Sequence, residues 1–186
     1  MSRSLIVGLG NPGRKYEGTR HNVGFEALRR LADRFRLELS RSKFDGVYTT
    51  GLIAHQDVVL LEPHTFMNRC GKSVLAARQF YDVPGDQILV FHDDIDLDCG
   101  RLKIKRGGGH GGHNGLRDII SRIGERDFVR LRLGVGRPDH GNVTGHVLGK
   151  FTSDERPDID EMIEEACDAV EIVLSDGVKE AQNRFH

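Results

Sequence analysis

The chain has 186 residues, a length that suits one domain and is short for two. Hydrophobic residues make up 38% and charged residues 30%, which is typical of a globular protein, and no apolar run approaches the roughly 18 residues of a membrane span. The net charge of −1 excludes neither anionic nor cationic partners, because it sums a basic N-terminal part and an acidic C-terminal part.

Hydrophobic periodicity predicts strands mixed with helices along the whole chain. In chain order the predicted elements are a strand over 4–9, a helix over 22–36, strands over 47–53 and 58–62 joined by a turn, a helix over 71–81, strands over 88–92 and 102–105, a helix over 116–123, a strand over 129–135, a helix over 154–174 and a short helix after Gly177. This order predicts a three-layer α/β domain with a mixed sheet.

The segment GLGNPG at residues 8–13 matches the GxGxxG pattern of dinucleotide-binding proteins and follows a predicted strand. Two features argue against that function. Pro12 lacks the N–H that would meet a phosphate, and Asp33, the acid 20 residues beyond the last glycine, falls inside a predicted helix. The simpler interpretation is a tight turn that exposes Asn11 at its tip, at the carboxyl end of the first strand.

Two further segments carry side chains that suit catalysis or binding. His21 lies at the expected start of a helix, and its ordinary pKa near 6.5 suits proton transfer, although a surface histidine beside a helix cap at Asn22 is the alternative. In the segment FMN, Phe66 and Met67 supply an apolar or stacking surface. The amide of Asn68 could hold a carbonyl or a water, or could simply cap the next helix.

Asp93 follows the apolar run ILVFH, where a carboxylate is well placed to hold a histidine in one tautomer. Four acids in six residues, HDDIDLD, also raise the question of a metal ion. Alternate residues of an extended chain point to opposite faces, and the spacing matches no calcium loop. We therefore expect no metal site in this run.

The segment RGGGHGGHNG, residues 106–115, is the least ordinary part of the sequence. Six of the nine residues from Gly107 to Gly115 are glycine, which costs conformational entropy unless the backbone approaches a ligand closely. Its two histidines lack the HExxH spacing of zinc proteases, and Asn114 could cap the following helix. Between Arg101 and Arg137, ten Lys and Arg residues accompany three acids, which indicates either a surface for polyanions or a solvated basic face.

In this order, the segments are similar to those of the bacterial peptidyl-tRNA hydrolase family. The resembling segments are GLGNPG at 8–13, YEGTRHNVG at 16–24, FMN with Gly71 and Lys72 behind it, HDDIDL at 92–97, GGGHGGHNGL at 107–116 and RLRLGVGRP at 130–138. They span most of the chain, and the Gly/His/Asn run is the most specific of them. His64, Cys70 and Asp94 stand where the family pattern would lead us to expect Thr, Ser and Glu, which puts fine substrate preference in doubt.

The resemblance implies an esterase that cuts the bond between a peptide and the 3′ end of tRNA. It implies a single α/β/α domain over residues 1–186 with a mixed, mostly parallel sheet, monomeric and without metal or cofactor. By resemblance, His21 would be the general base that activates water, Asp93 would stabilise its working protonation state, and Asn11 would contact the peptide next to the ester and help to reject free aminoacyl-tRNA.

The resemblance also implies a binding surface for the substrate. Asn68 and Asn114 would hold substrate and water, the 3′ end would lie against aromatic side chains, and basic side chains would meet acceptor-stem phosphates. The implied binding residues are Tyr16, Phe66, Met67, Asn68, Gly111, His113, Asn114, Lys103, Lys105 and Arg132. Residues 153–186 would form one helical wall or lid of the cleft.

Two other functions stay open at this point. A non-hydrolytic RNA-binding relative of the same fold could keep the basic groove without turnover, and a single-turnover assay separates it from an enzyme. A dinucleotide enzyme is the third hypothesis. The three cysteines, Cys70, Cys99 and Cys167, include no CxxC pair, so we expect neither a disulfide framework nor a zinc site. Together with an N-terminal apolar run too short for a signal peptide, they predict a cytoplasmic protein without membrane contact.

Overall fold

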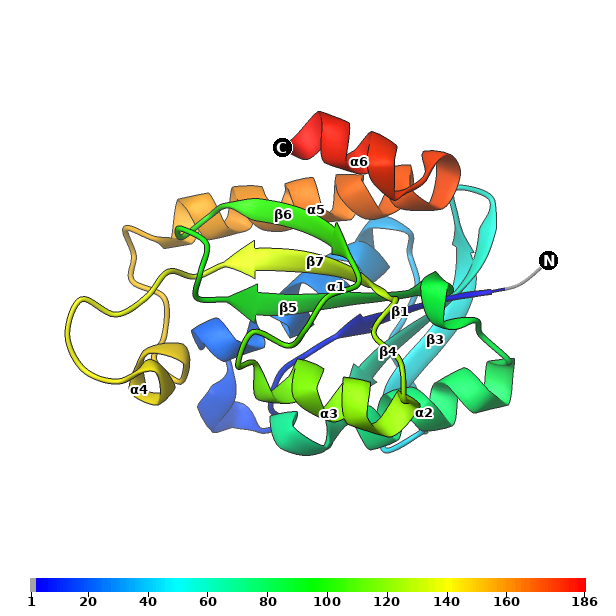
Figure 1. Cartoon of the computed structure of the whole chain (residues 1–186), viewed down its shortest axis with the longest axis horizontal. Coiled ribbons are helices and arrows are strands. Elements are labelled where there is room, and N and C mark those ends of the chain that lie inside the picture. Colours follow the sequence, from blue (N-terminus) through cyan, green and yellow to red (C-terminus); the bar gives the residue numbers. More distant parts are fainter. Residues whose placement is uncertain (1–2) are drawn as a thin grey trace.

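Four parallel strands lie at the centre of a seven-stranded mixed sheet in the computed structural model, which describes residues 3–186 (Figure 1). The strands are β1 (Ser4–Gly8), β2 (Arg41–Lys43), β3 (Gly46–Ile53), β4 (Gln56–Pro63), β5 (Ile88–Asp94), β6 (Leu102–Arg106) and β7 (Val129–Gly134). Their order is β2-β3-β4-β1-β5-β7-β6, in which β4, β1, β5 and β7 run parallel and the other three pair antiparallel at the two edges. The expected mixed, mostly parallel sheet is confirmed.

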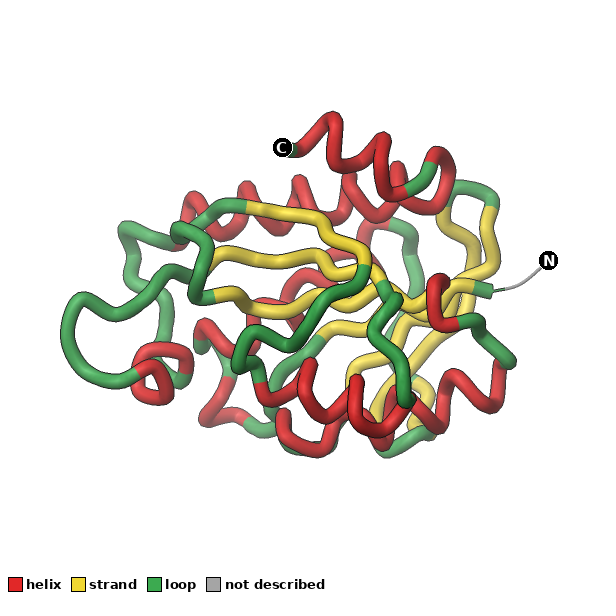
Figure 2. The backbone as a smooth tube through the Cα atoms, viewed as in Figure 1, coloured by secondary structure: helices red, strands yellow, loops and turns green. Residues whose placement is uncertain are grey.

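Helices cover both faces of this sheet, as the backbone trace shows (Figure 2). The helices are α1 (Val23–Arg34), α2 (Cys70–Tyr81), α3 (Asn114–Ile123), α4 (Val143–Val147), α5 (Arg156–Asp176) and α6 (Val178–Phe185). α1, α5 and α6 enclose one cluster of buried hydrophobic side chains against the sheet, and α2 and α3 enclose a second cluster on the other face. No helix among the described residues is both long and apolar enough to cross a membrane.

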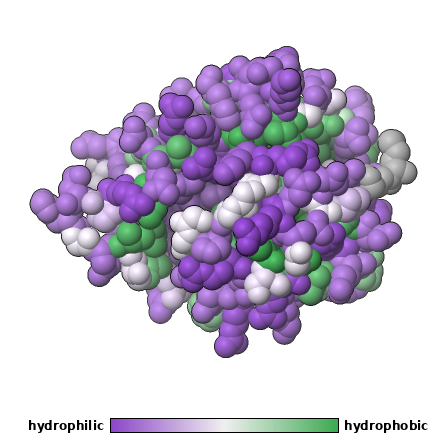
Figure 3. All heavy atoms as spheres, in the orientation of Figure 1, coloured by the Kyte–Doolittle hydropathy of each residue, from purple (hydrophilic) through white to green (hydrophobic). Residues whose placement is uncertain are grey.

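The central strand β1 shows why its sequence is apolar from Leu5 to Val7. Ile6 belongs to the cluster under α1, whereas Leu5 and Val7 belong to the cluster under α2 and α3. Successive side chains of a strand point to opposite faces, so a strand covered on both faces buries all of them. The outer surface is by contrast largely hydrophilic in the view of Figure 3.

Most predicted elements are confirmed, with four differences. The edge strand β2 and the short helix α4 were not expected, because each is too short to show a period. The turn between β3 and β4, expected over residues 51–57, is only Ala54 and His55, both with positive φ. β5 extends two residues beyond the apolar run and so includes Asp93 and Asp94.

The C-terminal segment 153–186 covers the sheet rather than a cleft. α5 packs against α1, and α6 lies along the edge strand β6, where the amide of Gln182 donates to the carbonyl of Ile104 at 3.0 Å and the Ile104 N–H donates to His186 Nε2 at 2.9 Å. These side chains satisfy edge-strand groups that would otherwise be unpaired.

Gly8 of the GLGNPG segment and Gly24 of α1 allow close helix packing. A Cβ on Gly8 would lie 2.4 Å from the carbonyl oxygen of Gly24 in α1, and a Cβ on Gly24 would lie 2.6 Å from the carbonyl oxygens of Leu9 and Phe91. Only glycine allows the start of α1 to approach the sheet this closely. His21 lies in the 3₁₀ helix Arg20–Asn22, which directly precedes α1, so this contact also fixes the position of its backbone.

We therefore predict that Gly24→Ala destabilises the fold, because the new methyl group would push α1 away from β1 and β5. Overpacking of this kind costs roughly 1–3 kcal/mol, or roughly 2–12 °C in Tm for a domain of this size. Thermal unfolding measures the change. Gly109→Ala is the matched control, because its Cβ would meet nothing within 4 Å. An unchanged Tm for Gly24→Ala would contradict the proposed close contact.

Candidate active site

A cleft of about 580 Å³ opens where the four parallel strands end. Each strand or the segment after it contributes to its lining: Met67 follows β4, Asn11 follows β1, Asp93 is one of the last two residues of β5, and Val143 lies beyond β7. Parallel strands bring their carboxyl ends to one edge of a sheet, which is where α/β proteins place their ligands. The topology therefore gathers residues that are far apart in the sequence.

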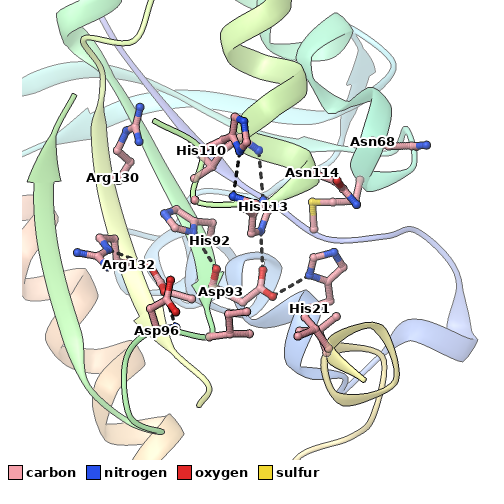
Figure 4. Close-up of a pocket in the computed structure, with 18 of the residues that line it drawn as sticks. His21, Asn68, His92, Asp93, Asp96, His110, His113, Asn114, Arg130 and Arg132 are labelled. Carbon is pink, nitrogen blue, oxygen red and sulfur yellow. Dashed lines mark hydrogen bonds and ion pairs between the residues drawn. The ribbon is translucent and has the colours of Figure 1, made fainter. Parts of the chain in front are cut away.

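The centre of this cleft is a buried carboxylate held by two histidines. Asp93 Oδ2 lies 2.7 Å from His21 Nδ1, and Asp93 Oδ1 lies 2.8 Å from His113 Nε2 (Figure 4). Asp93 is 3% exposed, and the rings of His21 and His113 are 5.3 Å apart. Both carboxylate oxygens thus have a histidine partner, which a buried charge requires.

His113 is the N-cap of α3, a position that we had considered for Asn114. Its Nδ1 accepts hydrogen bonds from the backbone N–H groups of Gly115 and Leu116, at 3.1 and 3.2 Å. An accepting Nδ1 carries no proton, so the proton of the neutral ring must lie on Nε2, where it is donated to Asp93. His113 therefore orients Asp93, a contact that sequence analysis, which placed it only among the binding residues, did not predict.

The two members of the His21–Asp93 pair shift in opposite directions. Burial lowers the pKa of His21, but the charge of Asp93 and the hydrogen bond to it raise the pKa more, so that it lies above the ordinary 6.5. Burial raises the pKa of Asp93, and the two histidines lower it far more, so Asp93 stays ionised. His21 Nδ1 then holds a proton toward Asp93, which leaves Nε2 as the basic nitrogen of the neutral ring.

His92 adds a third imidazole, which sequence analysis passed over. Its Nδ1 donates to the backbone carbonyl of Asp93 at 2.8 Å, and its ring lies 5.2 Å from that of His113. Burial, together with the neighbouring His113, lowers the pKa of His92 to about 4. A histidine that is neutral at every physiological pH supports Asp93 without competing with His21 for a proton.

Asn11 is buried, at 8% exposure, and not exposed at a turn tip as we expected. The side chain of Asn22 binds its backbone on both sides, accepting from Asn11 N–H at 2.8 Å and donating to its carbonyl at 3.0 Å, instead of capping α1. Asn11 Oδ1 accepts from the N–H of Met67 at 2.7 Å. That bond fixes the amide orientation, so the NH₂ group of Asn11 is the part available to a ligand in the cleft.

The mouth of the cleft carries exposed aromatic and amide groups. Phe66 is 54% exposed and is not part of the core; its ring lies 6.4 Å from that of Tyr16, which stands just outside the lining. Asn68 and Asn114 are exposed and both line the cleft, together with Gly111, and neither caps a helix. Figure 4 shows both amides on the His21 side of the cleft.

Basic side chains stand along β6 and β7 on the other side of the cleft. Lys105 and Arg132 line it, whereas Lys103 stands beside them without reaching the lining. Arg132 donates from Nε to Asp94 Oδ2 at 2.8 Å, an ion pair that orients its guanidinium group. Arg130 also lines the cleft, although the sequence indicated it only as part of RLRLGVGRP and not as a site residue.

The wall that faces the basic side chains is α4 and not the C-terminal segment. Val143, Thr144, Val147 and Leu148 line the cleft, and none of residues 153–186 does. Residues 153–186 therefore do not line the cleft, and their expected role as a lid stays a prediction. The apolar stripe of α5 packs against α1 and the sheet, so it cannot also face the cleft.

Among the described residues, one group has the arrangement of a possible metal site: His21, Asp93 and His113, with one ligand atom of each within 4.8 Å of the others. Its hydrogen bonds already use these atoms, and a metal ion would have to displace a proton from each histidine. Two other acids of the HDDIDLD run form ion pairs with arginines: Asp94 with Arg132 and Asp96 with Arg137. The geometry favours proton transfer over metal binding.

Comparisons with known proteins agree along nearly the whole chain. The sequence profile of the peptidyl-tRNA hydrolase family matches residues 5–186. The peptidyl-tRNA hydrolase of Colwellia psychrerythraea is 50% identical over 189 residues (100% of this chain, 97% of the relative), and that of Trichlorobacter lovleyi is 48% identical over 186 residues (100% and 96%). The crystal structure of the Acinetobacter baumannii peptidyl-tRNA hydrolase superimposes with a TM-score of 0.93 at 46% identity, covering 98% of this chain and 93% of that one.

We predict that Asp93→Asn lowers the pKa of His21 from above 6.5 to below 6.5, because burial remains while the carboxylate charge is lost. An NMR titration of the imidazole signals, with His21→Ala for assignment, measures both values. Asp94→Asn is the control, since Asp94 pairs with Arg132 and should leave His21 above 6.5. A His21 that already titrates below 6.5 in the unsubstituted protein would show that burial outweighs the ion pair.

Proposed function

The chain belongs to the peptidyl-tRNA hydrolase family, and from this premise we propose that His21 is the general base, Asp93 its partner, and the surrounding amides and cations the substrate contacts. The protein hydrolyses the ester bond between a peptide and the 3′ end of tRNA. The single observation that carries the assignment of the base is the 2.7 Å contact of His21 Nδ1 with Asp93 inside the cleft. We further propose that the activity recycles tRNA from peptidyl-tRNA released by ribosomes.

In the proposed mechanism His21 Nε2 takes a proton from a water molecule as the oxygen of that water attacks the ester carbonyl. The charge that develops on the imidazole is stabilised by Asp93, which His113 holds in place. The imidazolium then gives its proton to the departing 3′ oxygen of the terminal ribose. An ester needs no covalent nucleophile, and a positioned base alone contributes roughly 10²–10⁴-fold.

The exposed amides supply hydrogen bonds in this mechanism. Asn114 Oδ1 accepts a hydrogen bond from Arg117 Nη1 at 3.4 Å, which leaves the NH₂ group of Asn114 without this partner. We assign that NH₂ group, together with the amide of Asn68, to the substrate and the attacking water. A donor aimed at the oxygen that becomes negative is worth about 3 kcal/mol in the transition state. Neutral amides can give this stabilisation without changing the charge around His21, whereas a cation in the same place would lower the pKa of His21.

Asn11 has the chemistry to separate peptidyl-tRNA from free aminoacyl-tRNA. Its oxygen is already used by Met67 N–H, so only its NH₂ donors face the substrate. The carbonyl of an acylated amino group can accept such a hydrogen bond. A free α-ammonium group has only donors, which would face the NH₂ donors of Asn11 without forming a hydrogen bond. Asn11 therefore favours the blocked substrate.

The tRNA itself would be held by charge and stacking. Lys105 and Arg132, with Lys103 beside them, are assigned to acceptor-stem phosphates, because phosphate contacts position a nucleic acid without reading its sequence. Phe66 and Tyr16 are assigned to the single-stranded 3′ end, whose bases can stack on exposed rings. Met67 and Gly111 complete the lining near the ester.

We also propose that the enzyme works as a monomer in the cytoplasm. The cysteines Cys70, Cys99 and Cys167 are all free thiols, which suits a reducing compartment. All the groups assigned to catalysis come from one chain, so no second copy is needed to complete the cleft.

His21→Ala should lower the hydrolysis of N-acetyl-aminoacyl-tRNA at least a hundredfold while the fold stays intact, because the only assigned base is lost. His55→Asn is the control: His55 lies in the β3–β4 hairpin, at the opposite edge of the sheet, and asparagine tolerates its positive φ of 63°. It should retain wild-type turnover. A rate for His21→Ala within threefold of wild type would remove His21 as the base, and tRNA binding without turnover in the wild type would favour the RNA-binding alternative.

Asn11→Asp should reverse the substrate preference that Asn11 supports. The aspartate keeps an acceptor for Met67 N–H, so the local structure is retained, but it replaces the amide donor with a negative charge that attracts an α-ammonium group. We expect the ratio of kcat/KM for blocked over free aminoacyl-tRNA to fall at least tenfold, and less for Asn11→Ala. Equal ratios in wild type and Asn11→Asp would refute the discriminating role.

A further inference from the structure

Arg130 in β7 is a buried cation that, within residues 3–186, pairs with no carboxylate. It is 3% exposed, and its hydrogen bonds all go to backbone carbonyls: Nη1 donates to Gly109 at 2.6 Å, and Nη2 donates to Gly108 at 2.7 Å and to Arg126 at 3.2 Å. Two of these three carbonyls belong to the glycine-rich segment that leads to His113. Arg130 therefore donates two of its three hydrogen bonds to the loop and none to an acid.

Burial and neighbouring cations both disfavour the charge of Arg130. Burial and the nearby Arg126 and Arg132 lower its pKa to about 10. Lys105 is its direct partner across the antiparallel β6–β7 ladder, which places like charges opposite each other. An apolar residue at this position would avoid both costs, so the stability of the sheet does not account for the guanidinium group.

The glycine-rich loop that Arg130 binds has few side chains that could stabilise its conformation. Gly107, Gly108, Gly111 and Gly112 all have positive φ, and a chain this rich in glycine loses more entropy on ordering than any other. Its far end is fixed by His113, which caps α3 and binds Asp93. Its near end has Arg130, which stands on the β7 side of His92 and Asp93 in Figure 4.

We propose that Arg130 is a positioning residue for the hydrolysis reaction, which holds the carbonyls of Gly108 and Gly109 so that His113 and Asn114 keep their places beside Asp93 and the substrate. The inference rests on the proposed function of this cleft, because it assigns Arg130 a role through groups placed in the machinery there. Arginine is required for geometry: its planar fork reaches neighbouring carbonyls at once, whereas the single ammonium group of lysine cannot match that arrangement.

Arg130→Lys tests the proposal, because it keeps the charge and removes the fork. Displacement of catalytic groups by about 1 Å can cost on the order of 10²-fold in rate. We therefore expect kcat for N-acetyl-aminoacyl-tRNA to fall at least tenfold, while KM stays within threefold because the cationic rim is unchanged. Arg126→Lys is the matched control: it is the same substitution at an exposed neighbour whose backbone carbonyl is retained, and it should keep the wild-type kcat.

Hydrogen exchange without substrate supplies a second readout that does not depend on catalysis. The backbone N–H groups of Gly107, Gly112 and His113 are hydrogen bonded within or beside the loop, and their exchange should accelerate at least tenfold in Arg130→Lys. The amides of the central strands β1 and β5 should exchange as in the wild type. This measurement stays informative even if His21 proves not to be the base.

Three outcomes would overturn the proposal. The first is a kcat within threefold of wild type in Arg130→Lys, and the second is unchanged exchange of the loop amides. The third is equal acceleration throughout the sheet, which would make Arg130 a residue of general stability. Arg130→Met, which removes charge and fork together, should lower kcat at least as much and leave KM within threefold; if it does not fold, Arg130→Lys alone decides.

Discussion

The buried carboxylate of Asp93 is the constraint on which the rest of the site depends. A negative charge this far from water is stable only when both of its oxygens are hydrogen bonded, and His21 and His113 supply these bonds from two different segments. The charge in turn raises the pKa of His21 and fixes its free nitrogen toward the cleft. One ion therefore sets both the position and the proton affinity of the proposed base, and loss of either histidine would leave it partly unpaired.

The fold delivers these groups through the ends of parallel strands. Asp93 is the sixth residue of β5 and is as rigid as the sheet, whereas His21 and His113 each stand at the start of a helix. The approach of α1 over Gly8 and Gly24 places one histidine, and the capping of α3 places the other. Stability and catalysis thus share contacts: the helix cap that His113 provides also determines which of its nitrogens carries the proton.

Apolar periods are local features and were sufficient to predict the sheet and most helices, whereas the family resemblance pointed to His21, Asp93, Asn68 and Asn114, all of which line the cleft. What it could not predict are the partners of polar groups. Asn11 was expected at an exposed tip, yet Asn22 and Met67 bind it in the interior. The cap of α3, the wall formed by α4, and the true contacts of the C-terminal helices all depend on which segments meet after folding.

The basic stretch around β6 and β7 shows the same limit most sharply. A count of charges treats Lys105, Arg130 and Arg132 as equal members of one surface for a polyanion. In the structure Lys105 is exposed, Arg132 is oriented by Asp94, and Arg130 is buried with its donors directed to loop carbonyls. Since this guanidinium group is buried and bonded to loop carbonyls, we assign its role to hydrogen-bond geometry and not to net charge. A cation beside a nucleic-acid site can therefore serve the catalytic groups without touching the nucleic acid.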